Sequence, residues 1–370
     1  MTRVRSVELR LVGLPLVRPF RTSFGEMTHK ECVLVRVETE DAGGWGECVA
    51  STEPDFSEEW NEGAWLVLRD FLAPTLLQAG DPSSAELELA LAFVRGHPMA
   101  KGALLNALLD AELRAEKRSL ATFLGAERSR VECGVSVGIA PSTSQLLEQV
   151  DGYLSEGYLR IKLKIEPGTD VERVRAVRAA HPDIALSVDA NAAYGLEDID
   201  VFRELDDLGL LMIEQPLHHQ DLVNHAKLQA RLRTDLCLDE SIRSAADAAA
   251  AIELGACRIV NVKQGRVGGI LEAVRIHDVC DAQGVAVWCG GMLETGIGRA
   301  TNLALAAMPN FRLPGDTSAS RRYFHDDLTE PFELDPDGTM AVPSAPGVGV
   351  DPIPARLEAS TLRIERIGKE

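Results

Sequence analysis

Five charged residues recur along the second half of the chain at nearly constant spacing. In chain order they are Lys164, Asp189, Glu214, Asp239 and Lys263, and successive members lie 25, 25, 25 and 24 residues apart. Each ends or follows a short apolar run rich in Val, Ile and Leu, which is typical of a strand buried on both faces. Since the spacing equals that of a repeating strand–helix unit, we expect all five side chains on one rim of the fold.

Three carboxylates on one rim would repel one another strongly unless they shared protons or bound a cation. The oxygen ligands of Asp189, Glu214 and Asp239, with no His or Cys at matching positions, favour Mg²⁺ or Mn²⁺, or another hard divalent cation, over zinc. We therefore predict these three residues as metal ligands.

The two lysines flank the acids and can approach opposite faces of one small ligand. We predict Lys164 and Lys263 as catalytic acid/base groups. A lysine pKa of about 10.4 must fall to about 7 or 8 for the amine to act as a base at neutral pH. Lys162 points to the same side of its strand as Lys164, so we predict it either as the neighbour that lowers that pKa or as a partner of a substrate carboxylate.

These groups are suited to removing a proton from the carbon atom next to a carboxylate. A cation on the carboxylate and a lysine over the adjacent carbon can produce an enediolate. Protonation of its other face by Lys263 gives racemisation, whereas loss of a β-hydroxyl assisted by Lys164 gives dehydration.

Alternating strand and helix patterns must position these residues. Helical periodicity separates the apolar runs, and a glycine precedes several of them, where a helix end tolerates a left-handed residue. The expected strands are 135–139, 159–165, 184–188, 210–213, 236–238, 259–262 and 285–289. Eight units of about 25 residues make a (β/α)8 barrel. A doubly wound sheet uses the same repeat, but its Gly-rich phosphate-binding fingerprint is missing after the first strand, which favours the barrel.

The remainder of the chain has a different pattern. Strands are expected at 7–17 and 32–39 and helices at 64–72, 85–94 and 99–116. The last fifty residues, rich in Pro and Gly, look like extended chain that returns along this region. We predict an α+β capping domain over 1–130, completed by 322–370, and a barrel domain over 131–321.

Composition limits the class of protein. The 370 residues include 57 acidic and 38 basic ones, a net charge of -19, which disfavours nucleic acid and anionic membranes as partners. The sequence contains no long apolar stretch, and arginines interrupt its N-terminus, so we expect neither a membrane span nor a secretory signal. Seven scattered cysteines are typical of reduced thiols in a cytoplasmic protein. Composition therefore leaves a cytoplasmic enzyme as the default expectation but indicates no particular chemistry.

These residues resemble the muconate-lactonizing subgroup of the enolase superfamily. The motifs that carry the resemblance are Arg160–Lys164 (with its Lys-x-Lys), Val188–Asn191, Ile213–Pro216, Leu238–Ser241 and Asn261–Lys263. Within the subgroup, Trp288–Gly298, Leu313–Thr317 and Arg21–Gly25 are similar to o-succinylbenzoate synthases that are also N-acylamino acid (N-succinylamino acid) racemases.

The resemblance implies a modified TIM barrel, (β/α)7β, with an α+β cap and loops near 20–25 and 51–56 that close over the site. It implies Mg²⁺ or Mn²⁺ on the three acids and acid/base roles for both lysines. It places Ser136, Asn191, Gly291, Met292 and Leu293 in the substrate pocket.

The activity that it implies is dehydration of 2-succinyl-6-hydroxy-2,4-cyclohexadiene-1-carboxylate to o-succinylbenzoate, a menaquinone step, together with N-acylamino acid racemisation by a homo-oligomer. Muconate-type cycloisomerisation and dipeptide epimerisation are the alternatives on the same scaffold. Dipeptide epimerases carry an Asp-x-Asp on the last strand, where this sequence has Asp316 alone.

Overall fold

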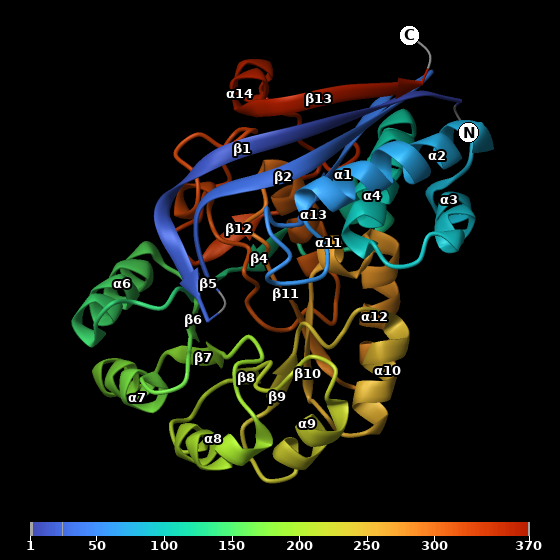
Figure 1. Cartoon of the computed structure of the whole chain (residues 1–370). Coiled ribbons are helices and arrows are strands. Elements are labelled where there is room, and N and C mark those ends of the chain that lie inside the picture. The colour runs from blue at the N-terminus through green and yellow to red at the C-terminus, as the bar shows by residue number, and fades with distance from the viewer. Residues whose placement is uncertain (1–2, 24, 369–370) are drawn as a thin grey trace.

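The computed structural model describes residues 3–23 and 25–368 and shows two large sheets, an antiparallel one above a parallel one (Figure 1), besides a short two-stranded one. The antiparallel sheet has the order β13-β1-β2-β3. Its strands are β1 (Val4–Thr22), β2 (Gly25–Thr39), β3 (Gly43–Cys48) and β13 (Thr361–Gly368). β1 and β2 form a long hairpin whose tip points down toward the parallel sheet. Both strands extend beyond the predicted ranges because polar residues near the tip, such as Arg21 and Glu26, interrupt the apolar alternation.

Helices cover one face of this antiparallel sheet. They are α1 (Asn61–Val67), the π-helical turn η1 (Leu68–Leu72), α2 (Ala73–Ala79), α3 (Ser84–Ala90), the 3₁₀ turn η2 (Leu91–Phe93) and α4 (Pro98–Ala115). The short α5 (Leu120–Phe123) follows and packs against α4. The long α4 lies directly against β3, which is possible because β3 carries glycines at the contact. A Cβ atom at Gly46 would lie only 2.0 Å from the Ala103 carbonyl oxygen, so a larger residue there would force the helix away from the sheet.

Seven parallel strands form the second sheet, in the sequential order β5 to β11. They are β5 (Gly134–Val137), β6 (Arg160–Lys164), β7 (Ala185–Asp189), β8 (Ile213–Glu214), β9 (Leu236–Leu238), β10 (Ile259–Val262) and β11 (Ala286–Cys289). The structure thus confirms a strand in each predicted unit. The largest shift is at β8, which begins at Ile213 instead of residue 210.

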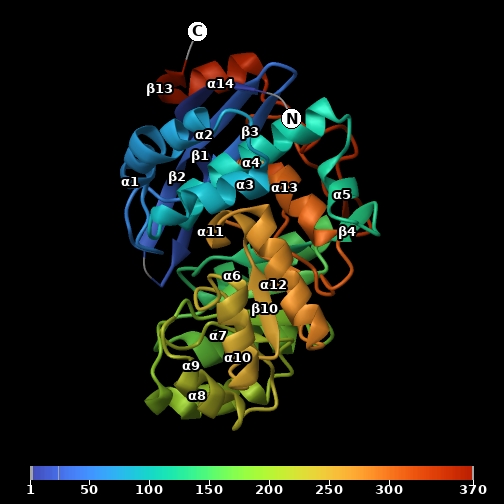
Figure 2. The same cartoon turned by 90° about the vertical axis from the view of Figure 1, so that its right-hand side faces the viewer.

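Helices surround the parallel strands on the outside (Figure 2). They are α6 (Thr143–Glu156), α7 (Asp170–Ala180), η3 (Leu196–Asp198), α8 (Ile199–Asp206), α9 (Leu222–Gln229), α10 (Ala245–Glu253), α11 (Gln264–Val267), α12 (Ile270–Ala282) and α13 (Gly296–Ala306). Gly157, one of the glycines that precede the apolar runs, has a φ of 101° and ends α6, as expected for a glycine at that place. Strands and helices bury a large apolar core between them, and a small cluster of Met212, Cys237, Ile259 and Trp288 is separate from it.

An irregular segment closes the parallel sheet into a barrel. The Val287 amide of β11 donates to the Asn310 carbonyl (3.2 Å), and the Asp316 amide donates to the Cys289 carbonyl (2.8 Å). On the other side, the Gly134 amide of β5 donates to the Gly315 carbonyl (2.7 Å). Residues 310–316 therefore take the eighth strand position, and the predicted modified TIM barrel with an antiparallel cap is confirmed.

The C-terminal region runs from the barrel back to the cap. It contains η4 (Ser320–Arg322), β12 (Thr339–Ala341), which pairs with β4 (Arg130–Glu132), α14 (Pro354–Ser360) and finally β13 beside β1. We keep 1–130 with 322–370 and 131–321 as the proposed domain division. Among the described residues, no helix has the length and apolarity needed to cross a membrane.

Candidate active site

The five spaced residues meet at one end of the barrel. Strand register places Lys164 beside Asp189 and Asp189 beside Glu214, and Asp239 and Lys263 each follow the last residue of β9 and β10. The Lys164 ammonium lies 2.7 Å from an Asp189 oxygen, and the Lys263 ammonium lies 2.6 Å from an Asp239 oxygen. The equal spacing in the sequence thus corresponds to contact in space.

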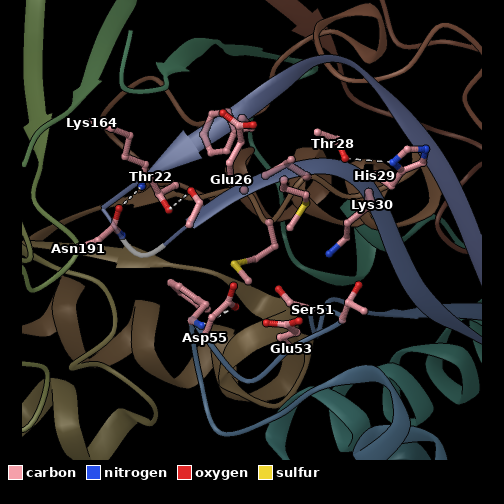
Figure 3. A pocket seen from close by; sticks show the side chains of 18 of the residues that line it. Thr22, Glu26, Thr28, His29, Lys30, Ser51, Glu53, Asp55, Lys164 and Asn191 are labelled. Carbon is pink, nitrogen blue, oxygen red and sulfur yellow. Dashed lines mark hydrogen bonds between the residues drawn. The ribbon is translucent and has the colours of Figure 1, made fainter. Parts of the chain in front are cut away.

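A cavity of about 350 Å³ lies above these groups, between the barrel and the cap (Figure 3). Its barrel side includes Lys164, Asn191, Lys263 and the segment 291–293, all of which were predicted for the site. Its cap side includes the tip of the β1–β2 hairpin and residues 51–53, 55 and 56, so both predicted cap loops contribute. Phe24, in the first of these loops, lies outside the described residues.

Lys162 and Ser136 lie on neighbouring strands but do not line this cavity. They are register partners on β6 and β5. The Lys162 ammonium contacts oxygens of Glu214 (2.7 Å), Asp316 (2.9 Å) and Asp189 (3.2 Å). Burial opposes the charge of Lys162, but attraction to these three carboxylates outweighs burial and raises its pKa well above the usual value. The charge of Lys162 is therefore balanced by these acids. The Ser136 hydroxyl is buried without a hydrogen-bond partner.

Asp316 and Arg160 extend this ionic layer. Arg160 donates to an Asp316 oxygen (2.7 Å), and the Arg160 and Lys162 side chains both lie over the ring of Trp288, 4.8 and 4.7 Å from its centroid. Despite burial, the two cations hold the pKa of Asp316 well below its usual range. The role of Asp316 beside Lys162 was not visible in the sequence, because the residue lies in the irregular eighth segment.

Asn191 connects Lys164 to a further acid, the half-buried Glu240. The Lys164 ammonium donates to the Asn191 side-chain oxygen (2.6 Å), and the Asn191 amide nitrogen donates to Glu240 (2.9 Å). Burial and, to a smaller extent, the negative charges of Asp239 and Asp189 raise the pKa of Glu240 to about 7. Sequence reasoning missed Glu240, although its place directly after Asp239 is a usable signal.

The donor set suits a hard divalent cation. The carboxylates of Asp189, Glu214 and Asp239 are at most 1% exposed, and burial together with the charge of Asp189 raises the pKa of Glu214 to about 8. One buried oxygen of Asp239 has no hydrogen bond, although an Arg266 nitrogen lies 3.2 Å away. Among the described residues, no three acidic, His or Cys side chains already surround a common point. Each of the three carboxylates is instead paired with a lysine, so a cation would have to replace these ammonium contacts.

A buried glutamate from the cap supports the cavity wall. Glu47 on β3 accepts hydrogen bonds from the Thr295 amide (3.0 Å), the Thr295 hydroxyl (2.7 Å) and the Gly298 amide (3.0 Å), at the start of α13. Glu294 accepts a bond from the amide of Met292, which lines the cavity. Burial and, to a smaller extent, the negative charge of Glu294 raise the pKa of Glu47 to about 7. The cap therefore helps to fix the segment 291–293, a link that spacing along the chain could not reveal.

Comparison with known proteins agrees with this geometry. Residues 5–125 match the family described as "Mandelate racemase / muconate lactonizing enzyme, N-terminal domain", and residues 145–356 match "Enolase C-terminal domain-like". An N-succinylamino acid racemase from Amycolatopsis sp is 57% identical over 97% of this chain and 98% of its own length. An o-succinylbenzoate synthase from Geobacillus kaustophilus is 48% identical over 94% and 93%.

Solved structures extend the agreement to the fold. An enolase superfamily member from Listeria innocua superposes with a TM-score of 0.95 at 41% identity, covering 99% of both chains. More distant is the structure of a muconate lactonizing enzyme from Pseudomonas fluorescens, with a TM-score of 0.92 at 25% identity over 97% of this chain and 99% of that one. By sequence, an L-Ala-D/L-Glu epimerase from Bacillus subtilis is 26% identical over 94% of this chain and 96% of its own length. Matches over nearly the whole length, together with the barrel and its ionic rim, lead to one conclusion: this chain is an enzyme of the enolase superfamily and belongs to its mandelate racemase/muconate lactonizing enzyme family.

Proposed function

We propose that the enzyme is an o-succinylbenzoate synthase that also racemises N-succinylamino acids. The observation that carries the proposal is that Lys164 and Lys263 line one cavity while each contacts a carboxylate of the buried acidic set. Relatives at 43–57% identity bear these two names. The cycloisomerase and epimerase alternatives have only the more distant relatives in their favour.

Asp189, Glu214 and Asp239 would hold the divalent cation, which we propose to be Mg²⁺. When bound, the cation supplies positive charge that stabilises an enediolate. The protein supplies the rest of the environment: buried carboxylates and the two amines beside them. Fixed charges stabilise the enediolate more strongly in this buried site than they would in water, because water screens them less.

For dehydration, we propose that Lys164 does the proton chemistry on one face of the ring. Its neutral amine takes the proton from the carbon next to the substrate carboxylate. The resulting ammonium gives that proton to the departing β-hydroxyl, which leaves as water from the same face. Lys263 contributes a positive charge on the opposite face.

For racemisation, the two lysines exchange roles. One amine removes the α-proton and the other, as an ammonium, protonates the opposite face, so the configuration inverts. Asn191 and the segment 291–293 line the cavity and are proposed to bind and orient the substrate between the two lysines. Lys162 and Ser136 are buried outside the cavity, so their proposed contact with the substrate requires side chains of the rim to rearrange.

We further propose a cytoplasmic homo-oligomer with a role in menaquinone biosynthesis and a small carboxylate as its partner. The net charge of -19 argues against binding to nucleic acid or to anionic membranes.

The test uses purified protein with Mg²⁺ and two substrates, the cyclohexadiene carboxylate and an N-succinyl-L-amino acid. We expect loss of diene absorbance with the first and loss of optical rotation with the second. Chelation with EDTA should abolish both activities, and added Mg²⁺ should restore them. If neither compound is consumed, or if EDTA has no effect on turnover, the proposal fails.

A further inference from the structure

Lys30 is a buried lysine on the cap side of the cavity. It belongs to β2, is 1% exposed and is among the largest fully buried side chains of the protein. Lysines are almost never fully buried unless they are paired, because removing an ammonium group from water is costly. Its position therefore calls for a compensating partner.

The described part of the protein supplies only a weak one. The Lys30 ammonium donates to the Val49 carbonyl (3.2 Å), and no carboxylate among the described residues lies within ion-pair distance of it. An ammonium has three donors, so this neutral acceptor leaves the charge unbalanced.

Glu47 does not fill this role. The charge of Lys30 does act to lower the pKa of Glu47, but burial dominates and the pKa is still raised to about 7. The oxygens of Glu47 are used by the amide and hydroxyl of Thr295 and by the Gly298 amide.

The geometry directs Lys30 into the substrate cavity. Lys30 lines the same cavity as Lys164 and Lys263. Figure 3 shows it reaching from β2 toward the segment that carries Ser51 and Glu53, on the far side of the cavity from Lys164. The acidic residues that line the cap side, Glu26, Glu53 and Asp55, are exposed, so water screens their charges more than that of Lys30.

We propose that Lys30 binds a second carboxylate of the substrate, at the end of its acyl chain. The inference rests on the proposed function, whose substrates each carry two carboxylates, and assigns the residue that recognises the second one. One carboxylate lies over the acidic cluster between Lys164 and Lys263, and the acyl chain extends to Lys30 on the cap. An uncharged acyl chain of the same length would leave the ammonium buried and unpaired, which is the source of discrimination.

The test measures equilibrium binding by calorimetry in the presence of Mg²⁺. The ligands are N-succinylglycine and N-butyrylglycine, whose acyl chains have the same number of carbon atoms but differ in the terminal carboxylate. The α-carbon of glycine is not a stereocentre, so no net racemisation disturbs the titration. We expect wild-type protein to bind the succinyl compound at least 10-fold more tightly.

Lys30→Met should reduce this preference by roughly 10- to 100-fold, since a hydrogen-bonded charge pair is lost. Lys30→Arg should retain most of the preference. Lys101→Met is the matched control, because Lys101 is also a cap lysine whose ammonium donates to a backbone carbonyl, that of Val94, but it does not line the cavity. The control should keep the wild-type preference. Circular dichroism should show that all variants fold.

The proposal is overturned if wild-type protein binds the two ligands equally, or binds neither, or if Lys30→Met keeps the preference. Loss of the preference in Lys30→Arg as well as Lys30→Met, with the fold intact, would also overturn the charge-pairing argument. Exchange of the α-protons of N-succinylglycine in deuterated water is a separate readout of the proposed function. Selective binding without exchange would leave Lys30 as the carboxylate partner while removing the proposed reaction.

Discussion

Replacing Glu47 by glutamine (Glu47→Gln) keeps the shape of a buried side chain but removes its charge. In the folded protein Glu47 accepts three hydrogen bonds at the start of α13, and its pKa is raised from an ordinary 4.5 to about 7 by burial and by Glu294. The neutral acid and glutamine are close in size, so the substitution separates the effect of charge from that of packing.

The sign of the pH dependence follows from proton binding. Between about pH 4.5 and pH 7 the folded protein binds more protons at Glu47 than the unfolded chain does, so this group lowers stability as the pH rises through that window. Ionisation of a carboxyl with a pKa near 7 instead of 4.5 costs the fold about 3 kcal/mol. Glutamine does not ionise and so avoids this cost. It has only one acceptor oxygen, however, and the weaker hydrogen bonding lowers the free energy of unfolding by about 1 kcal/mol at every pH.

We therefore expect the difference in free energy of unfolding between Glu47→Gln and wild type to change by about 2–3 kcal/mol in favour of the variant from pH 5 to pH 8. Urea unfolding followed by far-UV circular dichroism at pH 5, 6, 7 and 8 measures this difference directly. A difference between variant and wild type that stays constant across this range would refute the reasoning.

Two further substitutions test the packing inside the capping domain, where α4 meets β3. Asp110→Ala removes a buried carboxylate that accepts bonds from the amides of Trp45 and Val348 and pairs with Arg114; we expect a loss of about 2–4 kcal/mol of unfolding free energy at pH 7, and a loss below 1 kcal/mol would contradict the account. Gly46→Ala places a Cβ atom 2.0 Å from a backbone oxygen of α4; we expect at least about 2 kcal/mol of destabilisation, seen as a lower melting temperature, and an unchanged melting temperature would show that α4 can shift freely.

The barrel and its rim were predictable because both depend on local repetition. A strand followed by a helix recurs at a period that fixes both the strand order and the end at which Lys164, Asp189 and Glu214 gather. The parallel order needs only short-range connections, so spacing alone indicated which side chains would meet.

The residues that support the site from outside the rim were not predictable, because their positions depend on contacts between segments far apart in the sequence. Glu47 meets Thr295 across 248 residues, and Asp316 reaches Lys162 from a segment without regular strand pattern. Lys30 was also missed: in the sequence it resembles an ordinary polar residue of a strand, and only the folded structure shows it buried and donating to the Val49 carbonyl. Where such residues lie is determined by strand register and by contacts between the domains, and residue type alone does not reveal it.

The most direct measurement of the central proposal is enantiomer-specific α-proton exchange in deuterated water. Wild-type protein should racemise an N-succinylamino acid and exchange the α-proton of both enantiomers. Lys164→Ala and Lys263→Ala should each lose racemisation by at least about 10²-fold. Each variant should still exchange one enantiomer with retention, and the two variants should select opposite enantiomers. Unchanged racemisation in either variant, or exchange of the same enantiomer by both, would contradict two lysines acting on opposite faces of one substrate.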